Sequence, residues 1–409
     1  MVQLMKTTLA YDNLMPRSSF YILSVLLILS GCNGFFGEET STEFLDVPTG
    51  NNREVAYVPI QPVIGGLVEP TDIIAGWDEL IYVADAGTEE IISYDQAGNE
   101  LSRFGVPGLT AITQDRKLDI LALGRIDTTI NNAPLNLPTI YRIDLNKTGE
   151  YGLAQARITQ KVIHPFYFKS GTPTSRDERV TFTGISILAD NQYYVARNGD
   201  FNSPNQFGGP DDAILRFRAD DSFISPISIQ SSGGSISNAF FRKPQGISTK
   251  IMPPQIPQIA PQEDFLATSI DENNLLKVQV IRRGVEGINF IVDGLAEPDT
   301  SRAEGFLYEP GRFSRPVDVT VAGDGLGYIL VVDAETDSLY HFSGRGFEGV
   351  PPPSGSVTNK SIVVSFGGAG EGLTQFRNPG GVAYLDRILY VADTGNGRIL
   401  RFRLTTDFD

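Results

Sequence analysis

Cysteine, histidine and positive charge are all scarce in this chain of 409 residues. With one Cys and two His, the chain cannot form an intrachain disulfide or a cysteine-based zinc site. The 33 Lys and Arg residues are outnumbered by 49 Asp and Glu residues, which gives a net charge of −16. Nucleic-acid binding needs a basic surface stripe, so this composition argues against a nucleic-acid partner.

The remaining composition is that of a protein that folds. Hydrophobic residues make up 41% of the chain, charged residues 20% and aromatic residues 10%. These fractions allow a large core and exclude both a disordered and a collagen-like chain. Length alone does not fix the number of domains, because all-β proteins often extend over more residues as one unit.

The amino-terminal segment carries one short apolar run at residues 20–29, preceded by Lys6 and Arg17. Ten residues are too few to span a bilayer as a helix. A basic region followed by a short apolar run and then small residues is typical of a secretory signal.

The apolar run ends in Leu29-Ser30-Gly31-Cys32, which resembles a bacterial lipobox. The resemblance implies that residues 1–31 are a signal peptide, that cleavage precedes Cys32, and that the thiol of Cys32 carries a lipid such as palmitate. Two acyl chains on one residue are enough to hold a protein stably on a membrane. The alternative is a short buried core segment that happens to contain a cysteine.

Residues 32–52 are rich in Gly, Glu, Thr and Asn, which predicts a solvated tether between the lipid and the folded part. Asn33 rather than Asp follows the cysteine, and by resemblance to enterobacterial sorting this favours the outer membrane over the inner membrane. We therefore expect a lipoprotein of the cell envelope. No disulfide-linked partner is expected, because the only thiol carries the lipid.

A repeat is visible at the carboxy-terminal end of the chain. It consists of three segments: Asn378-Pro379-Gly380-Gly381-Val382, Tyr390-Val391-Ala392-Asp393 and Arg398-Ile399-Leu400-Arg401-Phe402. The Pro-Gly pair ends the preceding element, and each apolar stretch that follows predicts a strand. Together the three segments resemble an NHL repeat, which is one blade of a β-propeller.

Five further copies of this pattern occur upstream. Proline opens the inner strand of five copies in all, at Pro70, Pro107, Pro244, Pro316 and Pro379, and the copy at residues 182–185 lacks it. Second strands are predicted at residues 82–85, 121–124, 194–197, 266–269, 330–333 and 390–393. Third strands are predicted at residues 91–94, 140–143, 214–217, 275–278, 339–342 and 399–402. Six matched sets predict an all-β fold, a six-bladed β-propeller of NHL type.

The chain ends soon after the third strand of the last copy, so the outer strand of that blade must come from elsewhere. Residues 53–60 are apolar and β-branched and precede the first copy. Pairing this amino-terminal strand into the last blade closes the ring and removes a sheet edge. Residues 53–409 are therefore expected to form one domain.

Most of the copies contain insertions beyond the roughly 40 to 45 residues that such a blade needs. Residues 125–138 and 199–211 are predicted as loops between second and third strands, and residues 160–180, 228–243 and 282–313 as links between blades. The alternating strand directions place all five on one face. They form either a contact surface or tolerated insertions, and the aromatic residues at 165–168 slightly favour a contact surface.

The only two histidines, His164 and His341, are too few for a histidine-rich metal site. Acidic residues are the remaining candidates, because Asp85, Asp333 and Asp393 occupy equivalent places at the ends of second strands. A ring of such carboxylates would bind a divalent cation. Alternatively, each carboxylate accepts backbone amide hydrogens and fixes a turn.

The structural role is favoured, because the other three copies have Gly124, Arg197 and Ser269 at this place. We therefore expect no cofactor, and a binding or scaffold module for a protein, peptide or glycan ligand. The alternative is a divalent-metal-dependent enzyme, similar to lactonases or lyases of this fold, with its site at the central channel. Fold alone does not decide between these functions.

Overall fold

The computed structural model describes residues 54–408, except for residues 131, 148, 165–174, 204–209, 255–262, 285–288, 295–298 and 355. Contacts divide the chain into Met1–Glu54 and Val55–Asp409, and the fold below is that of the second unit. The lipobox with Cys32 and the aromatic residues at 165–168 lie outside the described residues. In the part of the chain that is described, no helix is long and apolar enough to cross a membrane.

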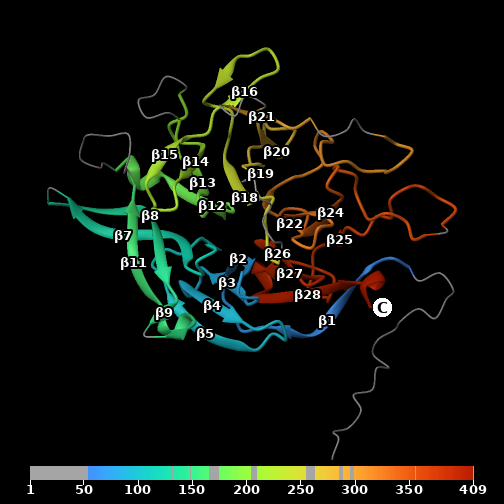
Figure 1. The fold of residues 1–409 in the computed structure, drawn as a ribbon, viewed down its shortest axis with the longest axis horizontal. Coiled ribbons are helices and arrows are strands. Elements are labelled where there is room, and N and C mark those ends of the chain that lie inside the picture. The colour runs from blue at the N-terminus through green and yellow to red at the C-terminus, as the bar shows by residue number, and fades with distance from the viewer. Residues whose placement is uncertain are drawn as a thin grey trace, which may run out of the picture. The chain divides into compact units, whose positions relative to one another are not determined.

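Most of the described strands form six sheets, each of which is one blade, and β9 and β10 form a separate two-stranded sheet (Figure 1). Blade 1 contains β2 (Pro70–Ala75), β3 (Ile81–Asp85), β4 (Glu90–Tyr94) and β5 (Glu100–Gly105). Blade 2 contains β6 (Ala111–Gln114), β7 (Ile120–Ile130), β8 (Ala133–Asp144) and β11 (Arg157–Ile163). Blade 3 contains β12 (Thr181–Ile187), β13 (Tyr193–Asn198), β14 (Ala213–Phe217) and β15 (Phe223–Pro226).

The second half of the ring follows the same plan with one enlarged blade. Blade 4 contains β18 (Pro244–Thr249), β19 (Phe265–Ser269), β20 (Val278–Arg283) and β21 (Phe290–Val292), extended by β16 (Ile229–Gln230) and β17 (Ile236–Ser237). Blade 5 contains β22 (Pro316–Val321), β23 (Ile329–Asp333), β24 (Ser338–Phe342) and β25 (Phe366–Gly367). Blade 6 contains β26 (Gly381–Leu385), β27 (Ile388–Asp393), β28 (Arg398–Leu404) and β1 (Tyr57–Ile64).

Short elements complete the described structure. They are the hairpin of β9 (Asn146–Lys147) and β10 (Glu150–Tyr151) and the 3-10 turns η2 (Leu153–Gln155), η3 (Asp177–Arg179), η4 (Thr394–Asn396) and η5 (Thr405–Asp407). The predicted six-bladed all-β propeller is thus confirmed. All six predicted second strands lie within β3, β7, β13, β19, β23 and β27.

One of the six predicted third strands is wrong. Residues 275–278 were expected to form it, but β20 begins only at Val278. Leu275 is 66% exposed and lies in the connection after the turn at Asp271. Val278, by contrast, is buried, so burial between blades, rather than local hydrophobicity, sets where this strand begins.

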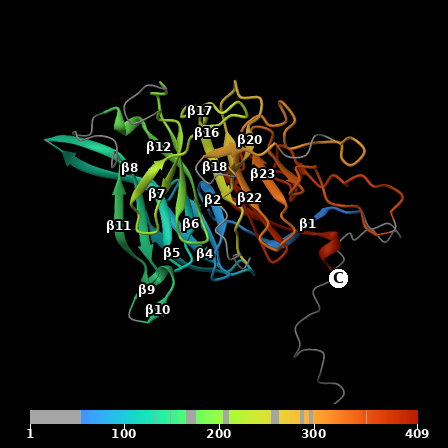
Figure 2. The same ribbon diagram turned by 45° about the horizontal axis from the view of Figure 1, so that its top comes forward.

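The insertion at residues 125–138 is also not a loop. β7 and β8 stay paired from Gly124↔Thr139 out to Ile130↔Ala133, and they extend beyond the rest of their blade (Figure 2). We call residues 125–138 the arm. The links predicted at residues 228–243 and 282–313 likewise contain strands, because β16, β17 and β21 extend the sheet of blade 4.

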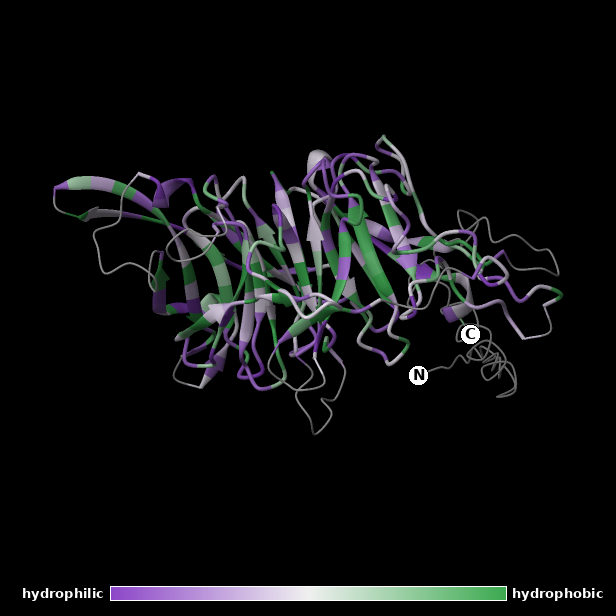
Figure 3. Ribbon diagram, turned by 90° about the horizontal axis from the view of Figure 1, so that it is seen from above, coloured by the Kyte–Doolittle hydropathy of each residue, from purple (hydrophilic) through white to green (hydrophobic). Residues whose placement is uncertain are grey.

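Apolar side chains between neighbouring blades hold the ring together. Every residue of β3, β19 and β23 is buried, because a blade packs against a neighbour on each of its two faces. Tyr82 of blade 1, for example, shares a cluster with Tyr141 of blade 2. Apolar residues accordingly concentrate on the strands (Figure 3).

The ring is closed by β1, as predicted, although the strand extends from Tyr57 to Ile64. It pairs antiparallel with β28, from Tyr57↔Leu404 to Ile64↔Ile399. The Tyr57 hydroxyl also lies 2.9 Å from Nδ1 of His341 in blade 5, and both side chains are buried. Burial lowers the pKa of His341 to about 3, so the imidazole is neutral and Nδ1 can accept the Tyr57 proton.

We predict that Tyr57→Phe lowers the free energy of unfolding by about 1–3 kcal/mol, because it leaves a buried acceptor without its donor. Urea unfolding followed by fluorescence measures this change. Tyr390→Phe is the matched control, because the buried Tyr390 hydroxyl has no hydrogen-bond partner among the described residues. Equal effects of the two substitutions would contradict the assigned role of the Tyr57 hydroxyl.

Candidate functional site

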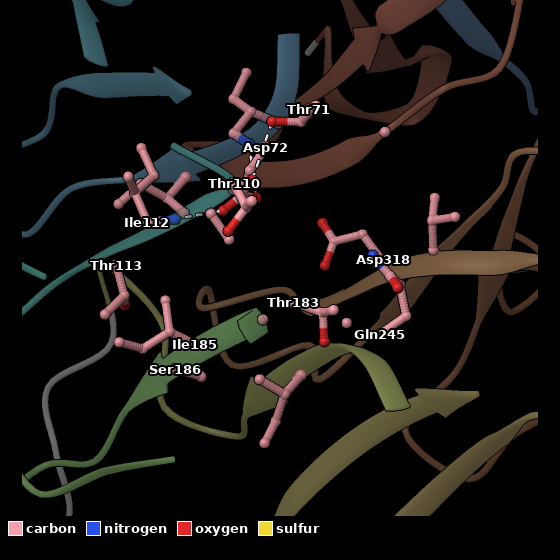
Figure 4. A pocket seen from close by; sticks show the side chains of 18 of the residues that line it. Thr71, Asp72, Thr110, Ile112, Thr113, Thr183, Ile185, Ser186, Gln245 and Asp318 are labelled. Atoms are coloured by element: carbon pink, nitrogen blue, oxygen red, sulfur yellow. Dashed lines mark hydrogen bonds between the residues drawn. The ribbon is translucent and has the colours of Figure 1, made fainter. Parts of the chain in front are cut away.

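The six inner strands enclose a cavity of about 530 Å³ at the centre of the ring. Its lining comes from β2, β6, β12, β18, β22 and β26, so every blade contributes to it. We call this cavity the channel (Figure 4). Inner and second strands pair antiparallel, so the inner strands begin at the end of the ring where the arm lies.

At one position of each inner strand, the neighbouring blade lies so close that it limits the size of the side chain. Strand pairing aligns six residues at this position: Asp72, Ala111, Gly184, Gly246, Asp318 and Gly381. A Cβ on Gly381 would lie 3.0 Å from Cα of Asp72, and one on Gly246 would lie 2.7 Å from Cα of Asp318. In the blade before each aspartate, the aligned position is therefore a glycine, because a side chain at that position would collide with the backbone of the aspartate.

The two aspartates at this position link neighbouring blades. Ile112 of blade 2 donates its backbone N–H to Oδ2 of Asp72 at 2.8 Å. In the same way, Val382 of blade 6 donates to Oδ2 of Asp318 at 2.9 Å. Both carboxylates line the channel, and they project into it from separate strands (Figure 4).

Threonines one residue before this position also connect the blades. Thr71 donates its hydroxyl to the Thr110 carbonyl at 3.0 Å, and Thr110 donates to the Phe182 carbonyl at 3.1 Å. Thr183 continues the series by donating to the Pro244 carbonyl at 2.9 Å. Side-chain hydrogen bonds therefore fix the wall of the channel on the side of blades 1 to 4.

Two further threonines, two residues after the same position, have no such role. Thr113 and Thr320 line the channel and are only 8% and 3% exposed. Among the described residues neither hydroxyl has a hydrogen-bond partner. Both residues line the channel, so each hydroxyl is available to a water molecule or a ligand inside it.

The channel is negatively charged, and its carboxylates are perturbed. Burial raises the pKa of Asp72 to about 6, although the N–H groups of Ile112 and Ile73 act in the opposite direction. Burial, and then the negative charge of Asp72, raise the pKa of Asp318 well above its ordinary value. Among the described lining residues there is no Lys, Arg or His to compensate this charge.

Asp85, Asp333 and Asp393 lie elsewhere, outside the channel lining. All three are fully buried at the ends of their strands, where they accept backbone amides. The donors to Asp85 are Val68, Glu69 and Gly87; those to Asp333 are Ser314, Arg315, Glu335 and Thr336; and Arg377 donates to Asp393. Asp393 is also paired with Arg398 at 2.7 Å. These are the bonds expected of carboxylates that fix turns.

A divalent metal of the kind used by lactonases does not fit the residues present. Such a metal needs several oxygen ligands that converge on one point. Within the described ranges, no group of three or more His, Cys, Asp or Glu residues is placed to hold a metal ion. The channel lining contains the carboxylates of Asp72, Asp318 and the exposed Glu69, and the first two already accept backbone amides.

The sequence pattern alone did not single out Asp72 and Asp318. A signal was nevertheless present, because an aspartate follows the opening proline by two residues in two copies of the repeat, at Pro70 and Pro316. Charged residues are rare in the inner strand of a blade, where both neighbours approach. An aspartate at that place therefore indicates a cavity rather than a turn.

Comparison with known families bears on blade 6, which β26, β27 and β28 form with the closing strand. Residues 376–402 are an NHL repeat. The NHL repeat covers the same segment from which the blade pattern was first recognised, and it ends within β28. No curated protein matches the sequence of the chain.

Several solved structures share the fold at low sequence identity. The PQQ-bound aldose sugar dehydrogenase from Streptomyces coelicolor is 15% identical with a TM-score of 0.51, over 86% of this chain and 98% of that one. A luciferin-regenerating enzyme is 9% identical with a TM-score of 0.50, over 85% and 95%. An auxiliary nutrient binding protein from Bacteroides thetaiotaomicron is 10% identical with a TM-score of 0.48, over 83% and 70%. At such identities the first two support the propeller fold alone.

The raised pKa of Asp72 makes a prediction about stability. The native state holds a proton at this site up to about pH 6, whereas the unfolded chain releases it near about pH 4, so native stability is lost as the pH rises through this window. We expect Asp72→Asn to become more stable relative to wild type by up to about 3 kcal/mol between these two pH values.

Urea unfolding at a series of pH values tests this expectation. Glu335→Gln is the control, because the Glu335 side chain is exposed at a turn. Its difference from wild type at each pH is the reference for a carboxylate removed outside the channel. A difference for Asp72→Asn that stays constant across the same window would contradict the raised pKa.

Proposed function

We propose that the protein is a lipid-anchored binding module of the cell envelope, whose central channel takes a small polar ligand such as the end of a peptide or glycan. The observation that carries this proposal is the channel itself, about 530 Å³ in volume and lined by all six blades. The unpartnered hydroxyls of Thr113 and Thr320 give it hydrogen-bonding groups that the protein does not use.

The size of the channel limits what the ligand is. Pockets for small molecules typically enclose about 300–1,000 Å³, and the channel falls within that range. A folded protein does not fit, but a monosaccharide or the terminal residues of a peptide do. The arm lies at the end of the ring where the inner strands begin, so it is placed to contact the remainder of a longer ligand.

The membrane anchor is proposed from the sequence. Cys32 follows an apolar run and small residues, and it is the only cysteine in the chain. A lipid at this position would tether the propeller through residues 33–52. The acidic net charge of −16 suits an exported domain that must stay soluble beside a membrane.

We predict that Cys32→Ser releases the protein from membranes without unfolding the propeller. Membrane fractionation measures the release, and circular dichroism with thermal unfolding checks that the fold is intact. Ser30→Ala serves as the matched control, because it keeps a small residue before the cysteine. Continued membrane attachment of Cys32→Ser would argue against lipidation.

Binding in the channel is tested by removing the two unused hydroxyls. Thr113→Val and Thr320→Val keep the side-chain shape, so we expect native stability and weaker binding, by about tenfold for the pair, of any peptide or glycan found by thermal-shift screening. Thr374→Val, at an exposed position outside the channel lining and away from the arm, is the control. Unchanged affinity of the double variant would contradict a channel site. Stoichiometric Ca²⁺ or Zn²⁺ in the purified protein would instead favour the metal-dependent lactonase-like or lyase-like alternative.

A further inference from the structure

The two channel carboxylates, Asp72 and Asp318, are half-buried, and they lack the compensation that several fully buried carboxylates of this protein have. Asp393 is paired with Arg398 at 2.7 Å, and Asp115 and Asp221 are paired with Arg142 at 2.6 and 2.7 Å. Asp85 and Asp333, which lack such a pair, accept three and four backbone amides. Buried charge is costly unless it is matched in one of these ways.

Asp72 and Asp318 have neither form of full compensation. Asp72 accepts two backbone amides, from Ile73 and Ile112, and Asp318 accepts the amide of Val382 together with that of Val319. An ionised carboxylate has about four acceptor positions. About half of the capacity of each group is therefore unused, inside a cavity whose described lining contains no cationic side chain.

We infer that the channel binds a primary ammonium group, held by Asp72 and Asp318 and by the hydroxyl of Thr113. This inference rests on the proposed function and names the class of its ligand. An ammonium group has three N–H donors, so it can donate to both carboxylates and keep one donor for a hydroxyl or a water molecule in the channel. Thr113 follows Ile112, which donates to Asp72, so its hydroxyl belongs to the same side of the channel as that carboxylate.

The rest of the lining indicates what the ammonium group is attached to. The channel lining also contains apolar residues, among them the half-buried Ile74 and the more deeply buried Ile185 and Ile247. A ligand that fills it therefore carries a short aliphatic stem behind the charged group. The net charge of −16 adds a general attraction for cations. The ligand class is thus a primary alkylammonium, whether the free amino end of a peptide or a small diamine.

A divalent metal ion is less compatible with the same residues. It would need more oxygen ligands than two carboxylates that each already accept backbone amides. In the ranges that the structure describes, no third acidic or histidine ligand stands with them. An ammonium group makes a smaller demand, because its three donors match one hydroxyl and two carboxylates.

The test is isothermal titration of the purified protein at about pH 7.5, where both carboxylates are expected to ionise when an ammonium group is bound. The probes are 1,4-diaminobutane, butane-1,4-diol and the peptide Ala-Ala with either a free or an acetylated amino end. We expect the diamine and the free peptide to bind and the diol and the acetylated peptide not to bind. The relative affinities of the diamine and the free peptide distinguish the two sources of the ammonium group.

Substitutions and pH sharpen the test. Asp72→Asn and Asp318→Asn should each weaken amine binding by about tenfold to one hundredfold, while Glu335→Gln leaves it unchanged. Binding should also weaken as the pH falls below about 6, because protonation of Asp72 removes its charge. Two other lining groups can ionise, namely Glu69, which is exposed, and Tyr384, which is buried. Burial and the charge of Asp324 raise the pKa of Tyr384.

Three results would overturn the inference. The first is that the diol and the diamine bind equally well and that the Thr113→Val and Thr320→Val double variant binds neither. The channel would then bind ligands without selecting an ammonium group, and the proposed function would stand. The second is amine binding that neither Asp72→Asn nor Asp318→Asn weakens. The third is absence of binding by all four probes. The proposed function itself fails by a different result, namely that ligands found by screening bind the Thr113→Val and Thr320→Val double variant as tightly as wild type.

Discussion

The close approach of six inner strands at the centre of the ring is the constraint on which the rest of the structure depends. It leaves no room for a Cβ at Gly246 and Gly381, where the next blade lies within about van der Waals contact. It also brings the backbone of each inner strand within reach of a side chain from the previous blade, as with Asp72 and Ile112. The channel walls are therefore held by hydrogen bonds between blades as well as by the apolar clusters farther out.

This constraint also determines the electrostatics. A carboxylate that bonds the next blade must sit in the wall of a narrow cavity, where water reaches it poorly and its charged form is disfavoured. The protein compensates buried acid in three different ways. Arg398 and Arg142 neutralise their partners, the turn carboxylates collect backbone amides, and the two channel carboxylates are left with elevated pKa values. The third arrangement is unfavourable for stability alone, which makes the channel the place where a functional requirement is most visible.

The fold was predictable because the same pattern of strand sequences occurs in each of the six blades. Second strands such as residues 82–85 and 390–393 are buried, because each blade packs against a neighbour on both faces, so the same apolar pattern recurs in each copy despite the insertions between copies. The closing strand was predictable by elimination, since the last blade needed an outer strand and residues 53–60 were the remaining apolar stretch before the first copy. The arm was mistaken for a loop because its strands alternate polar and apolar residues outside the repeat, with no neighbouring blade to impose a buried pattern.

The candidate site was less predictable, for a physical reason. The aspartates that repeat, such as Asp85 and Asp393, fix turns, whereas those in the channel occur in only two blades. A function located on the axis of a ring needs only a few side chains, so it breaks the repeat rather than following it. Blades 3, 4 and 6 keep glycine at the axial position, and blades 1 and 5 replace it with aspartate without changing the strand pairing. The same axial position thus serves close packing in some blades and carries a channel carboxylate in others, so the channel can change its chemistry while the ring keeps its structure.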